Sequence, residues 1–136
     1  MPHVTITRAA AADAPAVAVL VGELLAEIMT AIGQPAFNFE LDATTNRLRD
    51  YIAQEKYFVF VARDADGVPA GFIALIESYA LYAEGAFGTI PELYIRPDFR
   101  NNRVGRDLVE STVAFATSRS WTRLEVTTPQ IGRAHV

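Results

Sequence analysis

Ile90-Pro-Glu-Leu-Tyr-Ile-Arg-Pro-Asp-Phe-Arg-Asn-Asn-Arg-Val-Gly-Arg-Asp-Leu-Val109 joins a strand pattern, a polar turn and the beginning of a helix. Residues 90–95 are rich in the branched and aromatic side chains that suit a pleated sheet, and Pro97 ends that run. Residues that suit one buried helical face then recur every third or fourth position, at Val104, Leu108, Thr112 and Phe115. The stretch therefore predicts a strand, a turn and a helix in direct succession.

The turn in this stretch is rich in arginine, with Arg96, Arg100, Arg103 and Arg106. A helix N-terminus offers unpaired N–H groups and a partial positive charge, and a guanidinium can bind a phosphate through two hydrogen bonds. The turn is therefore a candidate site for a phosphate or pyrophosphate. The alternative is a solvated turn with ordinary surface arginines, and the spacing by itself favours neither.

The same stretch resembles the cofactor-binding motif of the GNAT family of acyl-CoA N-acyltransferases. In that family, a strand with a Val-x-Pro-x-x-Arg exit is followed by Arg/Gln-x-x-Gly-x-Gly/Ala at the start of a helix. Residues 93–100 fit the exit, Arg100 fits the Arg/Gln position, and Gly105 fits the last glycine. Arg103 replaces the first glycine, which requires a backbone without positive φ and a side chain directed away from the cofactor. The resemblance extends over essentially the whole chain.

The resemblance implies transfer of an acetyl group from acetyl-CoA to a primary amine of a small molecule or peptide, by direct attack on the thioester. An amine near its solution pKa of about 10 is mostly protonated and must lose a proton, and Glu92 is the expected general base. Backbone amides of Leu93, Tyr94 and Ile95 would hold pantetheine or polarise the thioester. The pyrophosphate would be bound by Arg100, Asn101, Asn102, Arg103, Val104, Gly105 and Arg106.

Other interpretations of these residues stay open. Glu92 is equally consistent with a carboxylate that pairs with a nearby arginine. The chain is alternatively a non-catalytic acyl-CoA-binding module, because Arg103 departs from the motif and the family's thiol-protonating tyrosine lies on a helix beyond the last strand found here. Tyr94 comes from the wrong element to take that role, so the sequence assigns no general acid.

Length and composition exclude several classes of protein. We expect one domain over residues 1–130, and the net charge of −4 argues against a general nucleic-acid binder. There is no cysteine, and His3 and His135 are isolated, so no disulfide and no metal site are expected. No segment approaches the roughly 20 apolar residues of a membrane span. The N-terminus lacks a signal-peptide pattern, which indicates a cytoplasmic protein.

The whole sequence predicts an α+β domain with the order β-α-α-β-β-β-α-β. Strands are expected at 3–8, 57–63, 70–77, 87–95 and 121–128, and helices at 9–32, from 42, and at 103–119. Gly33 is placed to end the first helix, and Asp42 to cap the second. The sheet is expected to be mixed and mainly antiparallel, with the two strands around the third helix parallel to each other.

Three aromatic or charged residues and one proline bear on the site. Pro91 cannot donate to a ladder, so it predicts a bulge, as in the splayed strand of the family, or else an edge strand. Phe37, Phe39 and Glu40 lie between the first two helices, where the resemblance implies a lid or acceptor wall. The preferred interpretation is a loop packed onto the core.

The C-terminal residues are unusual. The family continues after its fifth strand with a helix and two more strands, and this chain is expected to lack them. The codons ATC GGA AGA GCA CAC GTC would encode residues 131–136, and this nucleotide string matches a common sequencing adapter. We therefore expect these residues to be a non-native tail. The alternative is a genuine start of the next helix. An unpaired edge of the last strand would favour association with a second copy in a homodimer.

Overall fold

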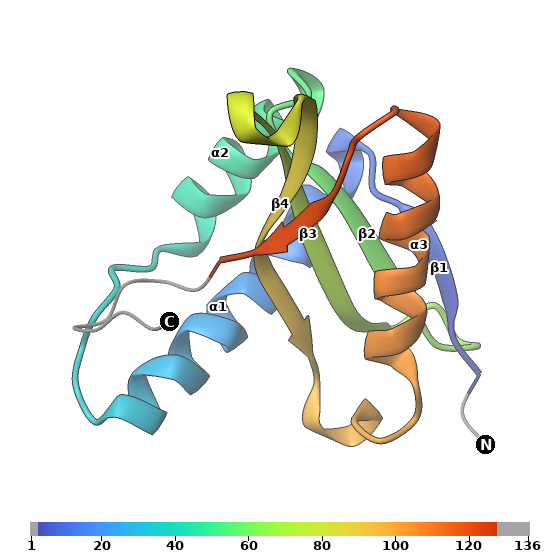
Figure 1. The fold of residues 1–136 in the computed structure, drawn as a ribbon. Coiled ribbons are helices and arrows are strands. Elements are labelled where there is room, and N and C mark those ends of the chain that lie inside the picture. The colour runs from blue at the N-terminus through green and yellow to red at the C-terminus, as the bar shows by residue number, and fades with distance from the viewer. Residues whose placement is uncertain (1–2, 128–136) are drawn as a thin grey trace.

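The computed structural model describes residues 3–127, which form a five-stranded sheet flanked by helices (Figure 1). The strands are β1 (Thr5–Arg8), β2 (Phe58–Arg63), β3 (Pro69–Ala80), β4 (Gly85–Ile95) and β5 (Leu124–Val126). The helices are α1 (Ala14–Ile32), α2 (Leu41–Ala53) and α3 (Val104–Ser118), with short 3₁₀ turns at Ala11–Asp13, Leu81–Ala83 and Pro97–Phe99. The predicted α+β class and the order of the elements are confirmed.

The strands lie in the sheet in chain order, β1-β2-β3-β4-β5. The first four are antiparallel neighbours, whereas β4 and β5 are parallel, with Gly88 opposite Leu124 and Ile90 opposite Val126. A parallel pair needs a crossover connection, and α3 supplies it. The prediction of a mainly antiparallel sheet with one parallel step around the third helix is therefore confirmed.

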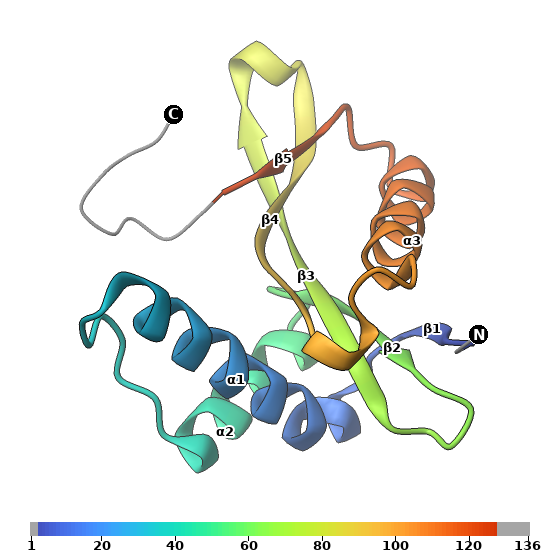
Figure 2. The same ribbon diagram turned by 90° about the horizontal axis from the view of Figure 1, so that it is seen from below.

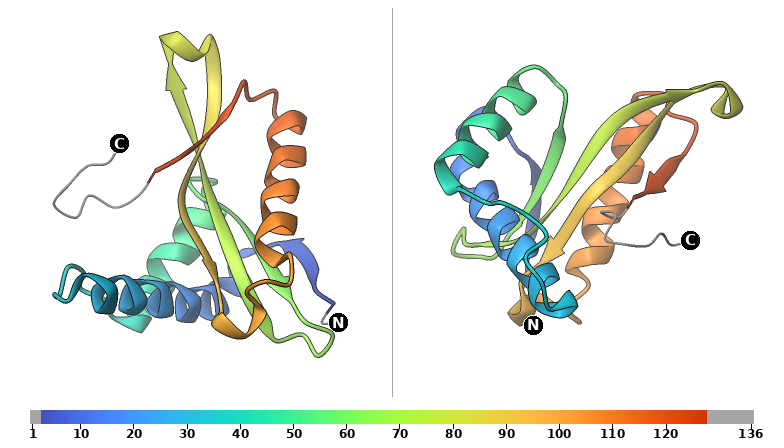
Figure 3. Two further views of the ribbon diagram at one scale, coloured as in Figure 1. Left: turned by 60° about the horizontal axis from the view of Figure 1, so that its bottom comes forward. Right: turned by 90° about the vertical axis from the view of Figure 1, so that its left-hand side faces the viewer.

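β2 explains why both faces of the sheet are covered. Phe58 and Phe60 belong to a core cluster with residues of α3, whereas Val59 and Val61 pack with residues of α1 and α2. A strand that is apolar on both faces has to lie inside the sheet, and β2 does pair with β1 and β3. Figure 3 shows α1 and α2 on one side of the sheet and α3 on the other.

α1 ends where the sequence predicts, because Gly33 adopts the left-handed conformation (φ 74°) and its N–H donates to the Met29 carbonyl at 2.9 Å. The expectation that no segment approaches the length of an apolar membrane span is wrong. By length and composition, the helical stretch Ala11–Ile32 is long and apolar enough to cross a membrane, with a mean hydropathy of 1.8. Val17 and Leu20 of α1 are fully buried in the cluster that includes Val59 and Val61 of β2, so one face of this helix packs onto the sheet.

α2 begins at a different cap from the predicted one. The N-cap is Glu40, whose carboxylate accepts from the N–H groups of Ala43 at 2.7 Å and Asp42 at 3.2 Å. Asp42 lies in the first turn, where its charge complements the helix dipole. The sequence pattern favoured Asp42 because aspartate is the more common capping residue. Glu40 is thus a capping residue rather than part of an acceptor wall.

β4 carries the predicted irregularity at Pro91. Ala74 lies opposite Glu92 but Ile76 lies opposite Thr89, so Ile90 and Pro91 together occupy one position of the ladder. This is a β-bulge. Within residues 3–127, pairing with β5 ends at Ile90, opposite Val126, the last residue of β5 (Figure 2). Beyond the bulge, the edge of β4 that faces away from β3 is left without pairing to β5.

Candidate functional site

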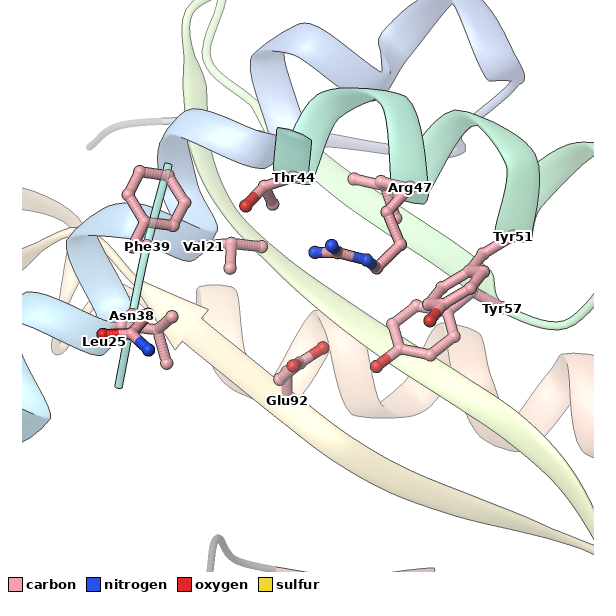
Figure 4. Close-up of a pocket in the computed structure, with 10 residues that line it drawn as sticks. Val21, Leu25, Asn38, Phe39, Thr44, Arg47, Tyr51, Tyr57 and Glu92 are labelled. Carbon is pink, nitrogen blue, oxygen red and sulfur yellow. The ribbon is translucent and has the colours of Figure 1, made fainter. Parts of the chain in front are cut away.

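Two pockets lie next to the bulge of β4. The first, here called the α2 pocket, has a volume of about 260 Å³ and is lined by residues that include Val21, Phe39, Arg47, Tyr51, Tyr57 and Glu92 (Figure 4). The second, here called the β4–β5 pocket, has a volume of about 400 Å³ and is lined by residues that include Leu24, Ile28, Pro91, Glu92, Leu93 and Val126. Glu92 lines both pockets, and Figure 4 shows its carboxylate in the α2 pocket.

Glu92 is partly buried, and the resulting loss of hydration raises its pKa. A hydrogen bond from the Tyr57 hydroxyl lowers that pKa in part. Burial, and after it the charge of Glu92, raise the pKa of Tyr57, which therefore stays a neutral donor. Glu92 forms no ion pair among residues 3–127. The alternative of an arginine-paired carboxylate is therefore wrong, and the polar group that acts on this carboxylate is the Tyr57 hydroxyl.

The remaining polar walls of the α2 pocket were not identified from the sequence. Arg47 and Tyr51 lie four residues apart on α2, and Figure 4 shows both side chains directed toward the pocket. That spacing places two residues on one helix face and was a usable signal. Phe39 also lines this pocket, and a Cβ at Gly22 of α1 would lie 2.7 Å from its ring. Its segment therefore both packs onto α1 and forms a pocket wall.

The turn after β4 presents backbone N–H groups at the start of α3. Within residues 3–127, no backbone hydrogen bond outside regular helices and strands has its donor between residues 101 and 106. The first such donor is Asp107, whose N–H binds the Arg103 carbonyl at 2.9 Å. Free N–H groups combined with the positive end of the α3 dipole can bind an anion.

Neither the backbone conformation nor the packing of the fold requires a glycine at position 105. Its φ is not positive, and a Cβ there would make only ordinary contact with Ile95, at 3.9 Å. At Gly71, by contrast, a Cβ would lie 2.5 Å from the Tyr94 carbonyl oxygen. The small residue at Gly105 thus leaves room for a group outside the chain, and this fits the expected place of a pyrophosphate.

Arg103 contradicts the requirement that this position avoids positive φ. Its φ is 66°, in the left-handed region, and Asn101 is similar at 73°. Asparagine tolerates that region, whereas the left-handed conformation destabilises an arginine by about 1 kcal/mol. Arg103 makes no ion pair in the described part of the chain. Arg106 pairs with Glu110 on the same helix, at 3.3 Å.

Arg96 and Arg100 are bound to α1. The Arg96 guanidinium donates to both carboxylate oxygens of Glu23, at 3.0 and 2.8 Å. Arg100 donates to Glu27 at 2.8 Å and to the Ile95 carbonyl at 2.8 Å. Two of the four arginines considered for phosphate binding therefore fix the end of β4 against α1.

The side chains of Leu93 and Tyr94 lie on opposite faces of β4. Leu93 is 40% exposed and lines the β4–β5 pocket. The Tyr94 hydroxyl donates to Glu23 at 3.2 Å, and burial raises the pKa of Tyr94. Its hydroxyl is thus engaged on the α1 side. Among residues 3–127, no group of three or more potential ligands could hold a metal ion.

Comparison with known proteins identifies similar sequences and folds. The model of the Acetyltransferase (GNAT) family matches residues 23–135. No curated protein matches the sequence.

Three solved structures illustrate the likeness of fold. A predicted acetyltransferase with acetyl-CoA from Clostridium acetobutylicum has a TM-score of 0.75 and 16% identity, over 96% of this chain and 84% of that one. The ribosomal-protein-alanine N-acetyltransferase of Brucella melitensis biovar Abortus 2308 has a TM-score of 0.72 and 18% identity, over 96% and 83%. An aminoglycoside acetyltransferase from an uncultured soil metagenomic sample has a TM-score of 0.72 and 19% identity, over 95% and 80%. At these identities the likeness is one of fold.

Proposed function

The chain belongs to the GNAT family of acetyltransferases, and on that premise we propose that it transfers an acetyl group from acetyl-CoA to a primary amine of a small molecule or peptide. The observation that carries the proposal is that Glu92 lines both the α2 pocket and the β4–β5 pocket. A carboxylate in that position can accept a proton from an amine in the first pocket while a thioester lies in the second.

The proposed acetyl-CoA site consists of the β4–β5 pocket and the turn before α3. Past Ile90, the edge of β4 that β5 leaves unpaired offers the backbone of Leu93, Tyr94 and Ile95 to the amides of pantetheine. The N–H groups of residues 101–106 would donate to the pyrophosphate, with Gly105 leaving space for it. The Arg100 guanidinium, which is bound to Glu27 and to the Ile95 carbonyl, would donate to a phosphate through its remaining N–H groups.

Glu92 is the general base in this proposal. Acetyl-CoA supplies the acetyl group and takes the electron pair of the broken C–S bond on its sulfur. The amine nitrogen forms the new C–N bond, and its proton passes to a carboxylate oxygen of Glu92, directly or through one water. Burial raises the pKa of Glu92, which makes it a stronger base than an ordinary glutamate. The Tyr57 hydroxyl, which Figure 4 shows near Glu92, would donate to this carboxylate.

An amine-panel assay tests the proposal. The chain is incubated with acetyl-CoA and a set of primary amines, while free CoA is detected with a thiol reagent and the acetylated amine by mass spectrometry. CoA release that depends on the acceptor supports acetyl transfer. Affinity for acetyl-CoA without such release identifies a non-catalytic acyl-CoA-binding module, and absence of acetyl-CoA binding contradicts both functions.

A further inference from the structure

The α2 pocket holds two opposite charges on facing walls. Glu92 comes from β4 and Arg47 from α2, and Figure 4 shows the Arg47 guanidinium directed into the space next to Glu92. The two residues do not form an ion pair with each other or with any other residue among 3–127. The cavity between them thus has a negative and a positive wall that the chain itself does not neutralise.

Arg47 is solvent-exposed and, unlike the arginines around it, forms no hydrogen bond or ion pair with another side chain among residues 3–127. Arg96 and Arg100 bind Glu23 and Glu27 of α1, and Arg49, two residues along α2, donates to the Asn46 side chain at 2.9 Å. Arg47 is the one basic residue, and Glu92 the one acidic residue, that line the pocket. A guanidinium has a planar fork of donors that matches a carboxylate. Its placement in the pocket therefore suits an anionic group on the ligand.

Resting on the proposed acetyl transfer, we infer that the acceptor is an α-amino acid with an apolar or aromatic side chain, whose carboxylate binds Arg47 while its amine faces Glu92. Part of the lining supports this class, since Val21, Leu48 and the ring of Phe39 offer an apolar surface, beside the polar side chains of Asn38 and Thr44. The volume of about 260 Å³ suits a small ligand. A polyamine would bring like charge against Arg47, which disfavours it.

The inference is tested by a ratio of kcat/KM values. Each apolar or aromatic amino acid is compared with its decarboxylated amine, for example phenylalanine with phenethylamine, at fixed acetyl-CoA. We expect the amino acid to be preferred by about tenfold or more, and Arg47→Gln to bring the ratio close to one. A general loss of activity cancels in this ratio. Arg49→Gln makes the same change of charge on α2 outside the pocket and should keep the wild-type ratio.

Several outcomes would overturn the inference. A wild-type ratio near or below one does so while leaving acetyl transfer intact, and so does a preference that Arg47→Gln leaves unchanged. If no amine is acetylated, the proposed function fails, and calorimetric titration with the same amino acids tests the acceptor site by itself. Binding that is lost in Arg47→Gln and kept in Arg49→Gln supports the site. Absence of amino-acid binding to the wild-type chain rules it out.

Discussion

Glu23 of α1 and Glu92 of β4 each lie near a tyrosine hydroxyl, that of Tyr94 and that of Tyr57, yet their pKa values shift in opposite directions. The guanidinium of Arg96 is the main cause that lowers the pKa of Glu23. Glu92 has only the Tyr57 hydroxyl, and its burial raises the pKa. The difference is one of partners, because a cation stabilises the charged form of a carboxylate whereas desolvation disfavours it.

The same contrast between groups with an ionic partner and groups without one is found along the segment that follows β4. Arg96 and Arg100 are satisfied by α1 and hold the strand end in place. The N–H groups of residues 101–106 and the pocket side chains Arg47 and Glu92 have no such partners within residues 3–127. Paired groups therefore build the frame, and the unpaired groups, of which Glu92 is partly desolvated, are available to ligands. Changes in the two sets should have separable effects.

The largest effect is expected for Glu92→Gln. Loss of the base should lower kcat about 100-fold or more at neutral pH with little change in acetyl-CoA affinity. Because the pKa of Glu92 is raised above its ordinary value of 4.5, the wild-type rate should fall as the pH drops through that raised pKa. This acid limb should vanish in the variant, whose deficit shrinks as rising pH deprotonates the amine. Full activity at pH 7 would assign the proton transfer to water or to another residue.

Gly105→Glu should weaken acetyl-CoA binding at least tenfold, or about 1.4 kcal/mol. The added carboxylate would occupy the space at the start of α3 and repel a pyrophosphate. The same charge favours the helix dipole, and the fold accommodates a Cβ there, so thermal stability should not fall. Calorimetry and thermal unfolding measure the two quantities.

The matched control for that variant is Val113→Glu, which adds the same charge at a half-exposed position of α3 away from its N-terminus. It should leave acetyl-CoA affinity at the wild-type value. Equal losses in the two variants would point to the net charge of the chain rather than to a site at Gly105.

Arg96→Gln should affect stability rather than binding. The Arg96 and Glu23 side chains are 28% and 35% exposed, so after solvent screening we expect a loss of about 1 kcal/mol in the free energy of unfolding. Glu23 has a lowered pKa in the folded state, so its contribution is present above its ordinary pKa and is lost as the pH falls through the folded value. The difference between wild type and variant should therefore shrink in acid. Denaturation at neutral and acidic pH measures it, and a loss of acetyl-CoA affinity with unchanged stability would place Arg96 in the site.

The frame of the fold could be predicted where one residue constrains its own backbone. Gly33 adopts positive φ, at 74°, where a helix end was expected. Pro91 marks the bulge because it lacks an N–H. The ion pairs of Arg96 and Arg100 were not predicted, because each joins residues 73 positions apart. Glu23 and Glu27 are four residues apart, as are Arg96 and Arg100. This equal spacing indicates two ion pairs only once α1 is known to lie beside the end of β4.

The cofactor motif and the α2 pocket also differ in how far the sequence could predict them. Glu92 and residues 93–106 form one continuous motif, so the sequence could nominate them together. The α2 pocket is assembled from α1, α2, β2 and β4, and no local pattern marks its walls. Tyr57 was expected only as the first residue of a strand, and no sequence pattern singled out Arg47. An acceptor pocket of this kind becomes visible only when the tertiary structure brings its walls together.

The smallest effect is expected where the cofactor motif departs from its family. Arg103 holds φ at 66° without an ion pair among residues 3–127, so Arg103→Gly should relieve the left-handed strain. Part of that gain is offset because glycine loses more backbone entropy on folding, which leaves about 0.5–1 kcal/mol of stabilisation. Asn101→Gly is the matched control, since asparagine already tolerates its φ of 73°, and its gain should be smaller. Urea denaturation resolves the two. A destabilised Arg103→Gly would mean that the arginine side chain contributes contacts that outweigh its backbone strain.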